Sequence, residues 1–187
     1  MLSFTKKYIQ DLNTILNSSN LEAISQIVEA LDNSKGRIYI IGNGGSAATA
    51  SHMTNDLGAG LRRREIKYFD VESLNDNTPV CTAIANDIGY ENIFYMQLKG
   101  RLKPQDLLIA ISCSGNSENI IKAVEYAKEE KATVIGITGF DGGKLKPMSD
   151  INYHVQTDKG QYGIVEDAHM ILNHIIYSYY IDQANSK

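Results

Sequence analysis

The sequence predicts an α/β protein: a three-layer, doubly wound parallel sheet of five strands, preceded by an N-terminal helical hairpin. Three observations lead to this prediction. Two amphipathic stretches open the chain, short β-branched runs then alternate with helical stretches, and polar glycine- and serine-rich loops follow two of those runs. Nearly continuous apolar strands that alternate with helices are typical of a parallel sheet covered on both faces.

The N-terminal part carries apolar side chains at helical spacing in two segments, residues 3–18 and 20–34. Ser19-Asn20 separates them, and Asn20 is a residue type that caps helices. We therefore expect a helical hairpin over 1–35, of a kind that often docks on a partner chain. The α/β core is expected over 36–187.

The rest of the chain alternates between the two kinds of element. Runs rich in β-branched residues are expected to be strands at 37–41, 66–71, 107–111, 133–138 and 151–155. Stretches with helical periodicity between and after them predict helices near 45–60, 78–86, 90–99, 117–130 and 161–183.

Composition excludes several classes of function. The chain has 187 residues, 43% of them hydrophobic, and a net charge of −4. This balance argues against nonspecific nucleic-acid binding, and the cluster Arg62-Arg63-Arg64 is typical of a solvated loop. Two cysteines do not make a disulfide framework. No apolar run reaches membrane-spanning length and no signal peptide precedes the first helix, so we expect a cytoplasmic protein that contacts no membrane.

The first polar loop reads "GNGGS", residues 42–46, and joins a buried run to an alanine-rich helix. In an open parallel sheet, ligands bind beyond the carboxyl ends of the strands. Glycines let the backbone approach a ligand, and a helix N-terminus favours an anion. The loop indicates a sugar-phosphate site, although a tight turn without a ligand is the alternative. It matches neither the dinucleotide nor the nucleoside-triphosphate fingerprint, so no nucleotide cofactor is expected.

The second polar loop, "SCSGNS" at residues 112–117, repeats this design before a helix that starts near Glu118. Serine hydroxyls and backbone amides can together bind three phosphate oxygens without a lysine. A helix cap by Asn116 or Ser117 is the alternative. Because a cap needs one such residue and this loop has four, we interpret the loop as the site of a phosphate monoester.

Four segments occur at the order and spacing found in one family: "GNGGSAATASH", "AIANDIGYENIF", "ISCSGNSENIIKA" and "GITGFDGGKL". With the N-terminal helices and the late "EDAHMILNH", they make the chain resemble the phosphoheptose isomerases (sedoheptulose 7-phosphate isomerases) of the SIS, or sugar isomerase, domain family. The resemblance covers nearly the whole chain. It implies one SIS domain over 1–187, a homotetramer with active sites between subunits, and conversion of sedoheptulose 7-phosphate to D-glycero-D-manno-heptose 7-phosphate.

The resemblance also assigns substrate-binding roles by position. Asn86 and Asp87 are implied to hold sugar hydroxyls, and Cys113 stands where the family usually has threonine. The loop residues implied to contact the sugar phosphate are Asn43, Gly44, Gly45, Ser46, Ser112, Cys113, Ser114 and Ser117.

The family's metal quartet is His and Glu on the first core helix, and Gln and His on the last helix. The matching residues are His52, Asp56, Glu166 and His174, a credible set for zinc or a similar divalent metal. His52 and Asp56, four residues apart, share a helix face. Glu166 and His174 are separated by about 12 Å of helix axis, so both reach one ion only if it lies between them.

Aldose–ketose isomerisation needs a base, an acid and a group that stabilises the enediolate. The resemblance implies Asp56, His174 and Glu166 as the catalytic candidates, and Glu166 could act as the base with Asp56 reduced to a ligand. His169, between the last two candidates, is interpreted as a solvated helix residue, with a role in the site as the alternative.

Two other functions compete with this one. The first is a non-catalytic SIS module that senses a sugar phosphate or binds a protein, as one relative of this shape does with the replication initiator. The second is an isomerase of another sugar phosphate.

Overall fold

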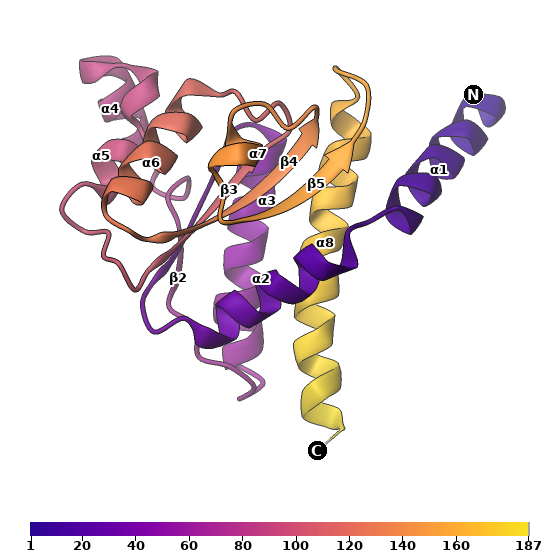
Figure 1. Cartoon of the computed structure of the whole chain (residues 1–187), viewed down its shortest axis with the longest axis horizontal. Helices are drawn as coiled ribbons and strands as arrows, with labels where there is room; N and C mark the ends of the chain where they lie inside the picture. Colours follow the sequence, from indigo (N-terminus) through magenta and orange to yellow (C-terminus); the bar gives the residue numbers. More distant parts are fainter. Residues whose placement is uncertain (187) are drawn as a thin grey trace.

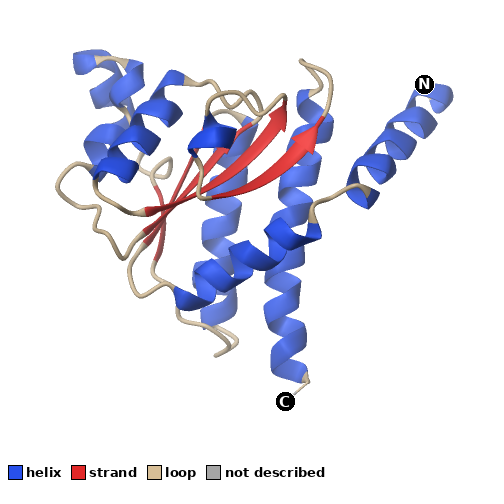
Figure 2. Cartoon of the chain, viewed as in Figure 1, coloured by secondary structure: helices blue, strands red, loops and turns tan. Residues whose placement is uncertain are grey.

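The computed structural model describes residues 1–186 and shows a parallel β-sheet with helices on both faces (Figures 1 and 2). Within those residues the sheet has five strands in the order β2-β1-β3-β4-β5, and all neighbouring strands are parallel. The strands are β1 (Ile38–Gly42), β2 (Val71–Ser73), β3 (Leu107–Ser112), β4 (Thr133–Phe140) and β5 (Ile151–Gln156). The predicted fold class is confirmed.

The second strand differs from the prediction of 66–71. Pairing with β1 begins only at Val71, opposite Ile38, and β2 ends at Ser73. Ile66 and Phe69 instead pack their side chains against the buried core. The apolar pattern that suggested a strand therefore reflects burial alone, without backbone pairing.

The core helices follow the predicted order. The helix expected at 90–99 divides into a short 3₁₀ turn, Tyr90–Asn92, and α5, and the one expected at 45–60 ends in a π-helical turn, Asn55–Gly60. The α-helices are α3 (Gly45–Thr54), α4 (Thr78–Ile88), α5 (Tyr95–Leu98), α6 (Glu118–Glu129), α7 (Leu145–Met148) and α8 (Tyr162–Asn185).

Alternation along β1 divides the interior into two hydrophobic layers. Ile38 and Ile40 pack with side chains of α2, α3 and α8, whereas Tyr39 and Ile41 pack with those of α5 and α6. Successive residues of a strand point to opposite faces of the sheet, so one apolar run serves both layers. The helices α3 and α8 consequently lie on the same face.

The two N-terminal helices, α1 (Leu2–Asn17) and α2 (Leu21–Asn33), are present as predicted, and the Asn20 side chain caps α2 by accepting from the Ala23 N–H at 3.1 Å. They do not fold back into a hairpin: Figure 1 shows α1 continuing away from α2. The apolar face of α2 is already covered by β5 and α8, so α1 has no place against it. The Tyr8 hydroxyl of α1 donates to Asp167 of α8 at 2.8 Å instead.

The strand order places a topological switch point between β1 and β3. Their chains leave toward opposite faces of the sheet, since β1 continues into α3 and β3 into α6. Ligands of open parallel sheets bind in the crevice beyond the strand ends at such a point. The two polar loops, 42–46 and 112–117, both lie there.

None of the helices described over 1–186 is long and apolar enough to cross a membrane. The cytoplasmic location stays a prediction.

Candidate active site

Helices α3 and α8 form one wall of the site, although they come from distant parts of the sequence. They lie side by side beneath the sheet (Figure 1). Gly45 at the start of α3 faces Glu166 near the start of α8, and Asp56, just beyond α3, contacts Asn173 further along α8. The two helices therefore run in the same direction.

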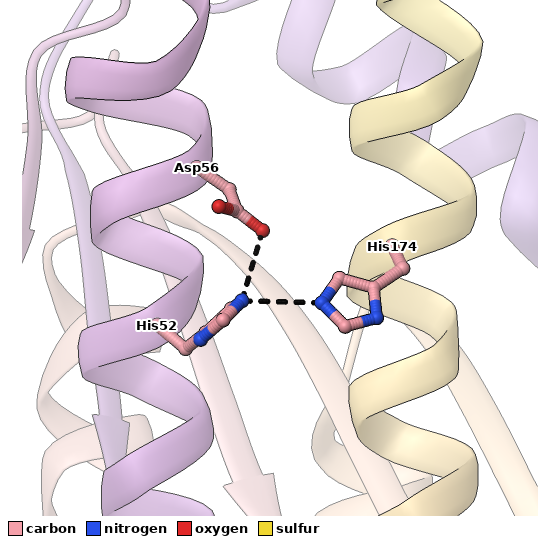
Figure 3. A group of neighbouring side chains, drawn as sticks. All are labelled: His52, Asp56 and His174. Carbon is pink, nitrogen blue, oxygen red and sulfur yellow. Dashed lines mark hydrogen bonds and ion pairs between the residues drawn. The ribbon is translucent and has the colours of Figure 1, made fainter.

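Three potential metal ligands meet between these helices: His52, Asp56 and His174 (Figure 3). The Nε2 atom of His52 lies 3.2 Å from Oδ2 of Asp56 and 3.1 Å from Nε2 of His174. All three ligand atoms lie within 4.8 Å of one another. The i, i+4 prediction for His52 and Asp56 is confirmed, and His174 joins them from α8.

The chemistry of this trio fits a divalent cation. Nε2 of His52 can either donate or accept one hydrogen bond, yet it lies within hydrogen-bond distance of both a carboxylate oxygen and a second imidazole nitrogen, so it can satisfy only one of them. A cation bound by all three side chains would remove that conflict. Two imidazoles and one carboxylate form a donor set suited to zinc and neighbouring transition metals.

Asp56 is held inside the protein. It is 7% exposed and lies in the π-helical turn, where the wider winding follows directly after α3. Its Oδ2 accepts a hydrogen bond from the Asn173 amide at 2.7 Å, and its Oδ1 accepts from the Asn55 amide at 3.1 Å. Turns of this type are often found at functional sites.

The two polar loops enclose a cavity of about 130 Å³ at the switch point. It lies beside the start of α3 and the start of α8. Its lining residues are Asn43, Ser46, Ile111, Ser112, Cys113, Ser114, Ser117, Tyr162 and Glu166. The structure thus brings together six of the loop residues assigned to the sugar phosphate, with Gly44 and Gly45 forming the adjoining backbone at the start of α3.

The loops are braced by polar contacts that sequence reasoning missed. Asn43 exchanges two hydrogen bonds with Asn119, at 2.8 and 2.9 Å, and its Oδ1 also accepts from the Tyr90 hydroxyl at 2.8 Å. Gly115, with φ of 61°, packs against the carbonyl of Gly142. These contacts fix the loop that would bind the anion.

Glu166 lies in this cavity and does not belong to the cluster of His52, Asp56 and His174. The separation of about 12 Å along α8 explains the difference, since eight residues put Glu166 and His174 at different heights of the helix. The expected set of four ligands is thus reduced to three among the described residues. This geometry does not support Glu166 as a metal ligand.

Asn86 and Asp87, expected to hold sugar hydroxyls, lie on the exposed surface of α4. The Asn86 amide donates to the Asp87 carboxylate at 2.9 Å, and neither residue lines the cavity. Within one chain, therefore, the structure does not bring them to the loops.

Two buried titratable groups lie near the site. Burial raises the pKa of the Cys113 thiol to about 11, with a further contribution from the negative charge of Glu166. His169 is 1% exposed, which corrects the interpretation as a solvated residue, and burial lowers its pKa to about 4. Its Nε2–H donates to the Thr138 carbonyl at 3.2 Å, so it anchors α8 to β4.

A cavity of about 520 Å³ opens near the opposite ends of the strands, around Arg37, Tyr39 and Arg101. Both arginines are paired with Glu72, at 3.1 and 2.6 Å. Both arginines are thus already paired, and the cavity lies away from the loops and the histidines.

Comparison with known proteins agrees with this architecture. Residues 4–139 match the SIS domain, so the chain has the fold of an SIS-type α/β protein. It is 39% identical to the phosphoheptose isomerase of Helicobacter pylori over 171 residues, which is 91% of this chain and 85% of that protein. It is 34% identical to the probable phosphoheptose isomerase of Thermoplasma acidophilum over 174 residues, 91% of this chain and 94% of the relative.

Solved structures give the same result. The phosphoheptose isomerase of Francisella tularensis superimposes with a TM-score of 0.83 at 29% identity, and that of Neisseria gonorrhoeae with 0.78 at 30%. Each match covers 97% of this chain and 95% of the other. The chain belongs to the phosphoheptose isomerase family of SIS-domain proteins.

Proposed function

We propose that the protein is an aldose–ketose isomerase that converts sedoheptulose 7-phosphate to D-glycero-D-manno-heptose 7-phosphate. One observation carries the proposal: a hydroxyl-lined cavity and a His–Asp–His cluster lie along the same pair of helices. The cavity suits the phosphate end of an extended sugar, and the cluster suits the end where the proton moves. The names of the relatives support this choice of substrate.

The spacing of the two parts fits an open-chain sugar phosphate. Ser46 lines the cavity and His52 belongs to the cluster, and the two are six positions apart along α3. At about 1.5 Å per residue, they lie roughly 9 Å apart along the helix axis. A seven-carbon chain contains six C–C bonds of about 1.5 Å each, which gives a comparable length once it is zigzagged and extended by phosphate.

At the phosphate end, the serine hydroxyls of the 112–117 loop and the N-termini of α3 and α6 would bind the ester oxygens. Glu166 lies in the same cavity, and a carboxylate repels a phosphate dianion. It therefore serves the substrate as an acceptor for sugar hydroxyls next to the phosphate.

At the reacting end, Asp56 is the base. Its carboxylate accepts the proton from C1 of the ketose, and the same proton is returned to C2 of the enediolate, which yields the aldose. His174 moves the hydroxyl proton between O1 and O2, because its imidazole can both donate and accept. The buried position of Asp56 limits the access of water to the carboxylate.

The cluster also offers ligands for zinc or a similar divalent metal. His52, Asp56 and His174 would hold the ion. When bound, such an ion polarises the substrate carbonyl and stabilises negative charge on its oxygen. The residues that orient Asp56 keep the same role with or without the ion.

The proposal includes a homotetramer. None of the described residues of α1 or α4 is buried. Both helices therefore expose apolar side chains, such as Phe4 and Val80. Such faces are typical of subunit contacts. In a tetramer, Asn86 and Asp87 of one subunit would be able to reach the sugar in another.

Turnover on a panel of C5 to C7 sugar phosphates tests the proposal. We expect isomerisation of sedoheptulose 7-phosphate, and at least a tenfold loss of kcat/KM with each shorter sugar, because the shorter chain cannot reach from the cavity to the cluster. Turnover of a different sugar phosphate would identify another isomerase of this fold. Calorimetric binding of the phosphate without any turnover would instead favour the non-catalytic module.

A further inference from the structure

Asn173 is a polar residue on the buried face of helix α8. It is 0% exposed, as are Leu172 and Ile176 on the same helix. A buried amide is expected to make hydrogen bonds with both its nitrogen and its oxygen. Among the described residues, only the nitrogen has a partner: Nδ2 donates to Oδ2 of Asp56 at 2.7 Å, whereas Oδ1 has none.

The amide cannot exchange its two ends. A carboxylate only accepts hydrogen bonds, so the nitrogen of Asn173 must face Asp56 and the oxygen must face away. Leaving a buried oxygen without a partner disfavours the folded state, and the arrangement is therefore not explained by stability. An unpaired buried group in a native structure calls for an explanation, and a catalytic role is one of them.

The position of the contact indicates what that function is. Oδ2 of Asp56 is the same atom that faces Nε2 of His52, and the residue after Asn173 is His174. Asn173 therefore holds the carboxylate oxygen that faces His52. The second carboxylate oxygen is held by Asn55, so the whole group is locked.

We infer that Asn173 is a positioning residue that aims the short carboxylate of Asp56 at the His52–His174 pair, so that Asp56 and Asn173 act as one unit. The inference rests on the proposed function, since it deepens the role of the same site. It has one consequence that differs from what the resemblance suggests, since the family has Glu at the position of Asp56. An Asp56→Glu substitution alone should lower activity, because the added methylene meets the Asn173 amide within a buried site.

The test compares Asn173→Leu with wild type. Leucine keeps the branching at Cγ but is larger, and it leaves Oδ2 of Asp56 without the Asn173 donor, so the melting temperature should fall modestly. On sedoheptulose 7-phosphate, kcat should fall by about 10- to 100-fold while KM stays within about twofold, because the phosphate cavity is untouched. Asn173→Ser, which keeps a donor, should recover part of the loss.

A double-mutant cycle shows whether the two residues act together. In the Asp56→Asn background, Asn173→Leu should have little further effect on kcat, since no carboxylate remains to be aimed. His169→Leu is the matched control: it removes another buried polar group one turn away on α8 without contact to Asp56, and it should change stability while kcat is retained. A drop in melting temperature with unchanged kcat for Asn173→Leu would overturn the inference.

A second measurement separates this inference from the proposed function. Cobalt(II) titration, followed by its absorption spectrum, reads the His–Asp–His cluster without any substrate. If the wild type turns over no sugar phosphate but binds cobalt, an affinity loss of about 10- to 100-fold in Asn173→Leu would support the inference alone. Unchanged cobalt affinity in that case, or a wild type that neither binds cobalt nor turns over, would overturn it.

Discussion

The imidazoles of His52 and His174 meet edge to face, with ring centroids 5.1 Å apart and planes at 72°, although 122 residues separate them in the sequence. Their Nε2 atoms are 3.1 Å apart. This pairing exists because α3 and α8 run side by side in the same direction. It defines the part of the site where the three potential ligands converge.

Metal binding should depend on this pair and be independent of Glu166. We expect His174→Gln to lower zinc affinity by at least about tenfold, because it removes one of three ligands. Glu166→Gln, a change at the other end of the wall, is the control and should keep the zinc content of wild type. Elemental analysis after dialysis against zinc measures both. Loss of zinc in Glu166→Gln would instead support a site of four ligands that includes Glu166.

Gly115 should be sensitive to a single methyl group. A Cβ at this position would overlap the backbone carbonyl of Gly142, and φ is also positive at 61°. Gly115→Ala should therefore destabilise the fold by clearly more than the ~1–2 kcal/mol that a left-handed residue costs. Chemical denaturation measures the free energy of unfolding.

Gly100→Ala provides the matched control for that change. Gly100 has φ of 74°, but no atom of residues 1–186 lies within 4 Å of its added Cβ. Its cost should stay near ~1–2 kcal/mol. If both substitutions lower the free energy of unfolding equally, the packing of the 112–117 loop on Gly142 does not contribute to stability.

His169 should make stability depend on pH. Its pKa is lowered by burial from an ordinary 6.5 to about 4, so the unfolded chain binds its proton more readily than the folded one. The stabilising effect is complete above pH 6.5 and is lost as the pH falls toward 4. The loss is on the order of 3 kcal/mol over that range.

The comparison of wild type with His169→Leu isolates this effect from other titrating groups. As the pH falls from 7 to 4, the wild type should lose unfolding free energy relative to the variant. Denaturation curves at several pH values give that difference. A constant difference would mean that His169 is not held neutral in the folded protein.

The two cysteines should differ in reactivity toward iodoacetamide. Burial raises the pKa of Cys113 to about 11, so at pH 8 only roughly one thiol in a thousand is ionised. Cys81 is half-buried and its thiol donates to the Leu74 carbonyl at 3.2 Å. We expect mass spectrometry to find Cys81 modified first, and Cys81→Ser to be nearly inert. Rapid modification of that variant would show that the cavity opens around Cys113.

Two of the predictions that failed have a common cause. The run 66–71 has a strand-like composition, yet Ile66 and Phe69 pack without pairing. His169 follows Asp167 in a helix and looked solvated, yet it faces β4. In both cases the local pattern does not show which neighbour will cover a side chain, because that neighbour is distant in the sequence.

The sequence alone determined the order of strands and helices, the two polar loops after β1 and β3, and the shared helix face of His52 and Asp56. These features depend on local periodicity and on spacing within one element. The tertiary structure was needed to show that Glu166 lies in the cavity, apart from the cluster of His52, Asp56 and His174, and that Asn173 donates to Asp56. Those relationships depend on how α8 is aligned against α3, and that alignment is fixed by the packing of both helices on one face of the sheet.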